Sequence, residues 1–164
     1  TTDFDTWPSF SKTILLTLMV IGACAGSTGG GLKCARVLLL FKNLRRNIHK
    51  ILHPRRVQVV HVDGTPVDEK IINGTSVYLA AYFILVVLSI LFISVDNKPL
   101  VTNLSAVLSC FNNIGPGLEI VGPTGNFSSY SAFSKLVLIF DMLAGRLEIF
   151  PILALISRGA WKKA

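Results

Sequence analysis

The sequence contains few charged residues and especially few acidic ones. Only 15% of its 164 residues are charged, nine of them Asp or Glu, and 51% are hydrophobic, whereas a typical soluble domain has about 25% charged residues. Three cysteines, Cys24, Cys34 and Cys110, are odd in number and lie in apolar surroundings, so they predict small buried side chains and not a disulfide framework. These scarcities exclude an ordinary soluble domain and indicate a membrane protein.

Patterns typical of enzymes and metal sites are also missing. The three histidines, His49, His53 and His61, have no cysteine or carboxylate at ligand spacing. No Ser/His/Asp set and no pair of carboxylates falls on a shared face, so we predict neither an enzyme nor a covalently bound cofactor. No charged segment followed by a signal-peptide cleavage site opens the sequence, and Thr1 is therefore expected to be an internal residue of a larger protein.

Three long apolar segments predict membrane-spanning helices. Residues 71–95 carry no charge and are long enough to cross a hydrocarbon core of ~30 Å. Residues 13–41 contain five glycines, three of them consecutive, and each glycine costs roughly 1 kcal/mol relative to alanine within a helix. Residues 132–157 are long enough to span, although they carry charged side chains, among them Asp141, Arg146 and Glu148. Both interrupted segments therefore invite a functional interpretation.

Positive charge is concentrated in two places. The connection after the first apolar segment carries eight cations with no Asp or Glu among them: Lys33, Arg36, Lys42, Arg45, Arg46, Lys50, Arg55 and Arg56. A second cluster follows the last segment: Arg158, Lys162 and Lys163. The positive-inside rule places both clusters in the cytoplasm and residues 96–130 outside. The basic run lacks interleaved aromatic side chains, so we predict no nucleic-acid binding.

The basic connection, residues 42–70, contains a predicted hairpin. Residues 57–69 alternate in character and turn at Asp63-Gly64, a strong signal for a two-residue hairpin loop. Two interpretations remain open: a linker that joins two helices, or a docking surface for a soluble partner. The cations assigned to docking are Arg45, Arg46, Arg55 and Arg56.

A short apolar segment is followed by residues that cannot continue a helix. Residues 100–111 reach only about halfway across a membrane at ~1.5 Å per residue, and the residues after them are rich in glycine, proline and asparagine. This order predicts a re-entrant loop whose carbonyls replace the hydration shell of a monovalent cation. The alternative is an extracellular loop with an amphipathic turn. The candidate filter is Asn112, Asn113, Ile114, Gly115, Pro116 and Gly117.

Three separated motifs, "GACAGSTGGGLK", "NNIGPGL" and "MLAGRLEIFPILAL", together resemble the bacterial Trk/Ktr/HKT superfamily of potassium transporters, specifically its TrkH-type membrane subunit. Members of that family build one pore from four consecutive M1–pore helix–filter–M2 repeats in a single chain. The resemblance implies an all-α integral membrane fold in three parts. These parts are the M2 helix of the third repeat (residues 1–41), the connection with its short cytoplasmic β-hairpin (42–70) and a complete fourth repeat (71–164). It assigns K⁺ to the carbonyls of Asn113, Ile114 and Gly115.

The resemblance also gives the glycines a role. In the family, the corresponding segment is a broken intramembrane loop that crosses the permeation path just inside the filter, and an arginine of the last helix, matched here by Arg146, points into the cavity below. The loop residues of this gate are Ala25, Gly26, Ser27, Thr28, Gly29, Gly30 and Gly31. The alternatives are close helix packing through glycines four residues apart and an ion-paired structural role for Arg146. Asp141 and Gly145 predict a close polar contact between helices.

Taken together, the residues and the resemblance predict potassium uptake across the bacterial inner membrane by a gated, channel-like pore or symporter. The expected partners are the remaining part of the same transporter, a second copy in a homodimer, membrane lipid and a TrkA-like cytoplasmic regulatory subunit, which alone binds nucleotide. Two rival classes remain. One is a structural scaffold of packed helices. The other is a membrane-anchored nucleotide-binding protein that uses "GSTGGGLK", although this spacing departs from the GxxxxGK[ST] motif.

Overall fold

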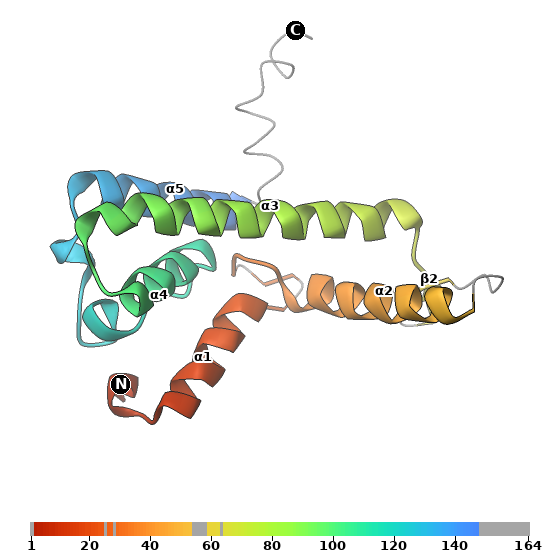
Figure 1. Cartoon of the computed structure of the whole chain (residues 1–164), viewed down its shortest axis with the longest axis horizontal. Helices are drawn as coiled ribbons and strands as arrows, with labels where there is room; N and C mark the ends of the chain where they lie inside the picture. The colour runs from red at the N-terminus through yellow and green to blue at the C-terminus, as the bar shows by residue number, and fades with distance from the viewer. Residues whose placement is uncertain (1, 25, 28, 54–58, 63, 148–164) are drawn as a thin grey trace, which may run out of the picture.

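The computed structural model describes residues 2–147 except 25, 28, 54–58 and 63. In this part of the chain, five helices and one two-stranded hairpin follow one another (Figure 1). The helices are α1 Ser9–Ile21, α2 Cys34–Leu52, α3 Glu69–Ile93, α4 Leu100–Phe111 and α5 Ala132–Leu147. Short 3₁₀ turns lie at Phe4–Thr6, Ser94–Asp96, Glu119–Val121 and Phe127–Ser129. The mostly helical class agrees with the prediction from the sequence.

The long helix α3 is the element against which α2, α4 and α5 pack. Asp68 caps its start, because the carboxylate Oδ1 accepts a hydrogen bond from the backbone N of Lys70 at 3.2 Å. Its buried residues recur every three or four positions, as expected when one face packs inward: Ile72, Thr75, Tyr78, Tyr82, Val86, Ser89 and Ile93. Residues Glu69–Asp96 form the one described helical stretch long and apolar enough to cross a membrane, while α1 and α4 are apolar but shorter.

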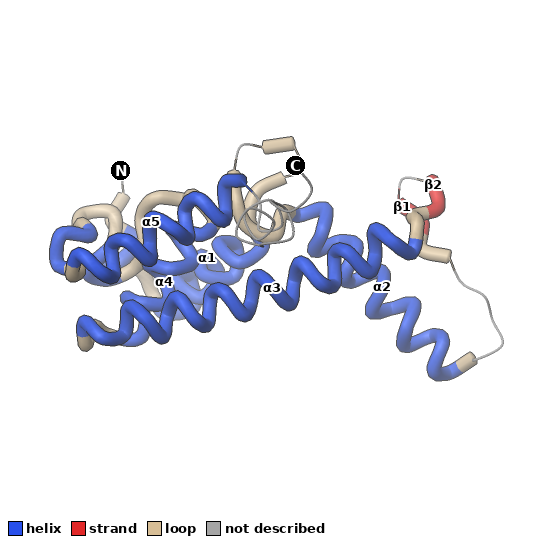
Figure 2. Tube along the Cα trace, turned by 90° about the horizontal axis from the view of Figure 1, so that it is seen from above, coloured by secondary structure: helices blue, strands red, loops and turns tan. Residues whose placement is uncertain are grey.

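Helix α4 has the bounds that the sequence predicts, from Leu100 to Phe111. Pro99 precedes it, and from Ala106 to Phe111 every residue is buried. The helix packs against both α3 and α5 (Figures 1 and 2). At ~1.5 Å per residue it is about 18 Å long, and its C-terminal end meets Tyr82 in the middle of α3 through a hydrogen bond from Asn112. A buried half-helix is therefore present.

The first apolar segment is broken at its glycines, as the family resemblance implies. Helix α1 ends at Ile21 and α2 begins at Cys34, and the two helices point in different directions (Figure 1). Gly22 leaves α1 with φ 76° and Lys33 enters α2 with φ 62°, both in the left-handed region. Left-handed backbone at both ends requires the chain to leave one helical path and join another.

The basic connection begins as helix. The expected linker starts at residue 42, but α2 continues to Leu52, because the basic side chains of this stretch are good helix formers on an exposed face. The predicted hairpin is present and very short: β1 His61–Val62 pairs antiparallel with β2 Thr65–Pro66. The side chain of Lys42 donates to the carbonyl of His61 at 2.7 Å, which ties the hairpin to α2.

The expectation that all three cysteines are buried is wrong for two of them. Cys110 in α4 is buried, but Cys24 and Cys34 are exposed. These two residues lie within and directly after the loop between α1 and α2, so the apolar residues beside them in sequence do not enclose them. The thiol of Cys34 lies 3.7 Å from the carbonyl of Gly22, to which it donates a weak hydrogen bond.

The start of α4 is held by a buried tyrosine from the loop before α5. The Tyr130 hydroxyl donates to Oδ1 of Asn103 at 2.9 Å, and both residues are buried. Burial, together with the negative charge of Asp96, raises the pKa of Tyr130 to about 12, so the phenol stays a neutral donor at physiological pH. This bond fixes the loop that follows the candidate filter to the helix that precedes it.

We predict that Tyr130→Phe lowers the stability of the transporter that contains this chain. The change leaves a buried amide oxygen of Asn103 without its donor, at a cost of about 1–3 kcal/mol. The thermal midpoint of the purified protein in detergent measures the loss. Ser129→Ala is the matched control, because it removes a neighbouring exposed hydroxyl. Equal midpoints for both variants would contradict the assignment.

Candidate functional site

The six candidate filter residues divide into buried ends and an exposed middle. Asn112 and Gly117 are buried, Asn113 is half-buried, and Ile114, Gly115 and Pro116 are exposed. Asn113 and Gly115 have positive φ values of 54° and 110°, so the backbone does not continue the helix. Within the described residues, no hydrogen bond engages the carbonyl oxygens of Asn113, Ile114 or Gly115. Three consecutive peptide carbonyls are thus available on the surface of this chain.

Both ends of the segment are anchored by side chains of other elements. The side-chain amide of Asn112 donates to the hydroxyl of Tyr82 at 3.2 Å and to the carbonyl of Leu108 at 2.9 Å. At the other end, the backbone N of Leu118 donates to the hydroxyl of Ser105 at 2.9 Å. Gly117, the preceding residue, is tightly packed: a Cβ at this position would lie 2.6 Å from a methyl group of Val121 and 3.1 Å from the Ser105 hydroxyl oxygen. The exposed carbonyls are therefore held between two fixed points.

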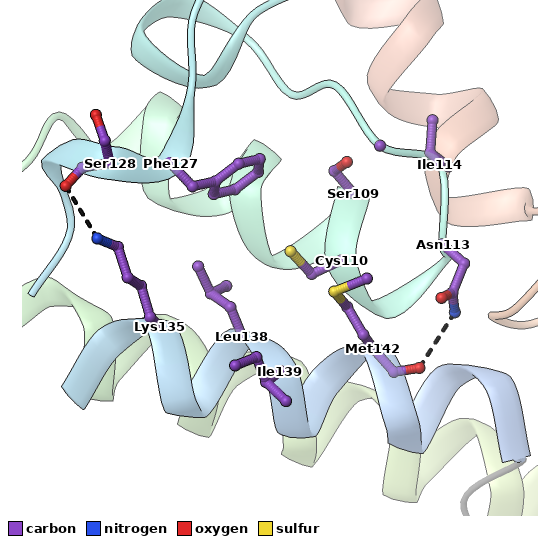
Figure 3. Close-up of a pocket in the computed structure, with 11 residues that line it drawn as sticks. Ser109, Cys110, Asn113, Ile114, Phe127, Ser128, Lys135, Leu138, Ile139 and Met142 are labelled. Atoms are coloured by element: carbon purple, nitrogen blue, oxygen red, sulfur yellow. Dashed lines mark hydrogen bonds between the residues drawn. The ribbon is translucent and has the colours of Figure 1, made fainter. Parts of the chain in front are cut away.

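Asn113 also connects the segment to α5. Its side-chain amide donates to the carbonyl of Met142 at 3.3 Å (Figure 3). Beside this bond lies a cavity of about 600 Å³ between the end of α4, the candidate filter and α5. Figure 3 shows Cys110 of α4 and Leu138 and Met142 of α5 among the residues that line it, with Phe127 and Lys135 at a distance from Asn113. The C-terminal end of α4 adds the negative end of its helix dipole near the exposed carbonyls.

The segment between α1 and α2, residues 22–33 and called the glycine loop below, contacts the C-terminal end of α4 through Gly30 and Gly31. The backbone N of Gly30 donates to the carbonyl of Asn112 at 3.2 Å. A Cβ on Gly30 would lie 2.8 Å from the carbonyl oxygen of Phe111 and 2.9 Å from that of Gly145 in α5, and a Cβ on Gly31 would overlap the side chain of Asn112. These approaches explain why the sequence has glycines here: loop, α4 and α5 meet backbone to backbone.

The loop is also held by two hydroxyl groups. The Tyr78 hydroxyl of α3 donates to the carbonyl of Gly31 at 3.2 Å, and the Ser27 hydroxyl accepts from the backbone N of Gly29 at 3.2 Å. The guanidinium of Arg36 stacks 4.0 Å above the Tyr78 ring. Glycines 22, 26 and 30 do not lie on a helix, so this geometry does not support the alternative of helix packing through a four-residue glycine spacing.

The structure describes Arg146 and two of the four predicted docking arginines. Arg146 is exposed and follows Gly145, whose carbonyl faces the glycine loop. Arg45 is exposed, but Arg46 is engaged by Glu69 of α3 at 2.9 Å. Four predicted residues lie outside the described part of the chain: Ala25, Thr28, Arg55 and Arg56.

Sequence reasoning missed several residues that position this site. Tyr78 and Tyr82 were treated as part of a uniform apolar span, although two tyrosines four residues apart in an aliphatic helix signal polar partners. Asp5, which precedes α1, was also missed. Its Oδ1 accepts from the backbone N of Glu119 at 2.9 Å, and Glu119 accepts from the hydroxyl of Thr102. These bonds tie the segment before α1 to the residues that follow the candidate filter.

A helical chain with an anchored half-helix, exposed carbonyls and a broken helix beneath them belongs to the cation-transport class. Residues 1–160 match the family model TrkH, described as a cation transport protein. The chain belongs to this family, which confirms the resemblance of its motifs.

The relatives agree with this assignment. The chain is 37% identical over 157 residues to the Trk system potassium uptake protein TrkH of Escherichia coli K12, covering 96% of this chain and 32% of that protein. It is 32% identical to TrkG of the same organism, covering 99% and 33%. The crystal structure of the potassium transporter TrkH from Vibrio parahaemolyticus superposes with a TM-score of 0.86 at 36% identity, covering 98% and 34%. The chain therefore spans about a third of the length of these relatives, all named for transport and none for catalysis.

We predict that Gly145→Ala disrupts the junction of α5 with α4. The added Cβ would overlap the carbonyl of Phe111, and overpacking of this kind costs about 1–3 kcal/mol. The thermal midpoint of the purified transporter should fall. Gly74→Ala in α3 is the control, because a Cβ there meets nothing within 4 Å and alanine favours helix. A midpoint lowered equally by both changes would contradict the close approach.

Proposed function

We propose that this chain forms part of a potassium-uptake pore and supplies one segment of its selectivity filter. The observation that carries the proposal is the row of carbonyls at Asn113, Ile114 and Gly115, which accept no hydrogen bond from the described residues and lie between the buried residues Asn112 and Gly117. Peptide carbonyls in such a row replace water around K⁺. The remaining segments of the filter come from the rest of the same transporter, since this chain matches only about a third of the length of its relatives.

The glycine loop and Arg146 form the gate of the proposed pore. The loop lies below the filter segment because Gly30 bonds to Asn112, and Arg146 follows the α5 residue that the loop contacts. A fixed cation near the path opposes a passing K⁺. At roughly 8 Å and an effective dielectric constant of about 20, two unit charges repel by about 2 kcal/mol. Such a barrier slows permeation, and movement of the loop changes it.

The elements fit the repeat organisation implied by the resemblance. In this scheme α1, the glycine loop and α2 form the second helix of the third repeat, and α3, α4 and α5 form the outer helix, pore helix and inner helix of the fourth. The transporter lies in the bacterial inner membrane with α2, the hairpin and the residues after α5 on the cytoplasmic side, because the basic side chains gather there. The pore either conducts K⁺ as a channel or couples K⁺ uptake to the movement of a second ion.

The cytoplasmic face docks the regulatory partner. The proposed assembly is a homodimer of complete subunits, in contact with membrane lipid and with a TrkA-like regulatory subunit that binds nucleotide. Of the two predicted docking cations that the structure describes, Arg45 is the better placed, because it is exposed, whereas Arg46 is paired with Glu69. A phosphate cradle in "GSTGGGLK" is disfavoured, since the amides of Gly29 and Gly30 already donate to Ser27 and Asn112.

Rubidium uptake by the full-length transporter in proteoliposomes tests the filter assignment. Gly115→Ala should lower uptake or its preference for Rb⁺ over Na⁺ by tenfold or more, because alanine is strained at φ 110° and the carbonyls then reorient. Gly64→Ala is a close control: its φ is 79°, it has equal open space, and it lies in the hairpin. A transporter that is folded and transports equally well in both variants would favour the scaffold alternative.

A further inference from the structure

A carboxyl group in α5 lies buried where this helix meets α3. Asp141 has no exposed surface. The Ser89 hydroxyl of α3 donates to its Oδ1 at 2.7 Å, while its Oδ2 is buried and has no hydrogen-bond partner. Neither the filter nor the gate described above uses this group. A fully buried oxygen without a partner is rare in proteins and calls for an explanation.

The surroundings of Asp141 provide no counter-ion. Helices α3 and α4 both pack against α5. Helix α3 contributes the neutral hydroxyl of Ser89, and α4 contributes the thiol of Cys110, which is near enough to interact electrostatically with the carboxyl of Asp141. On α5 itself, the ammonium of Lys135 donates to the carbonyl of Ser128, away from the carboxyl. Arg146, five residues on, is exposed. Within the described residues, no basic side chain forms an ion pair with Asp141.

An ionised carboxylate without a counter-ion is strongly disfavoured in such a place. Moving an unpaired charge into an apolar interior costs far more than a protein's net stability, so the group takes up a proton instead. Because this chain alone already encloses Asp141 completely, the rest of the transporter cannot supply a cation without opening the contact between α3 and α5. The unpartnered Oδ2 is the natural position for the proton.

We propose that Asp141 is a proton-binding site whose protonated carboxyl joins α5 to α3 through Ser89. The site lies one helical turn before Gly145, which packs against the end of α4 and the glycine loop. Proton loss leaves a charge that draws water between α3 and α5, and the structure around the filter base loosens. The site does not depend on which ion the chain transports.

Infrared spectroscopy of the full-length transporter at neutral pH tests the proton directly. A protonated carboxyl has a C=O stretching band distinct from those of carboxylates and amides, and this band shifts in deuterium oxide. We expect the wild-type protein to show such a band and Asp141→Asn to lack it. Asp68→Asn is the control and keeps the band, because Asp68 is exposed and asparagine also caps helices. Identical spectra for wild type and Asp141→Asn would overturn the proposal.

The pH dependence of stability provides a second readout that a purely structural role would not move. An unfolded chain ionises an aspartate at about pH 4, whereas burial without a counter-ion favours the protonated form of Asp141 in the folded chain. Stability therefore falls as pH rises above that value, with the unfolding constant increasing up to tenfold per pH unit. Asp141→Asn should flatten the dependence of the thermal midpoint on pH between pH 5 and 8, and Asp68→Asn should not. The same slope in wild type and Asp141→Asn would contradict proton binding.

Discussion

The backbone junction at the C-terminal end of α4 is the contact on which the rest of the structure depends. There the carbonyls of Phe111 and Asn112 meet the glycine loop from one side and Gly145 of α5 from another. No side chain fits between these backbones, so glycine is required at both contacting positions. The same approach brings three separate parts of the chain to one point: the break in the first apolar segment, the half-helix and the last helix.

Helix α3 fixes this junction from outside. Tyr78 holds the glycine loop and Tyr82 holds the first filter residue, so one helix positions the proposed gate and the proposed filter through hydroxyl groups one turn apart. Ser89 extends the same face to Asp141 of α5. Since all three residues belong to the buried stripe of α3, displacement of this helix is transmitted to every part of the site. Arg36, stacked on Tyr78, adds a link to the basic helix α2.

Local signals in the sequence were sufficient for several elements. Pro99 and the glycines after Phe111 set the ends of α4, and the Asp-Gly signal correctly predicts a hairpin between His61 and Pro66. The length of α2 was not predicted, because basic residues support an exposed helix as readily as a linker. The partners of Tyr78 and Tyr82 lie 47 and 30 residues away along the chain, and no local pattern specifies them. The prediction of burial was wrong for Cys24 and Cys34 for the same reason, since apolar neighbours in sequence need not enclose a residue.

In the proposed pore, the glycine loop beside the filter segment restricts the flow of ions. Rubidium uptake into proteoliposomes containing the full-length transporter tests it most directly, with wild type compared with Gly30→Ala and Arg146→Ala. A Cβ on Gly30 unseats the loop and the loss of Arg146 removes the fixed charge, so uptake should be several-fold faster in both variants. Unchanged uptake in both, with the proteins folded and Gly74→Ala as reference, would return the loop and Arg146 to packing roles.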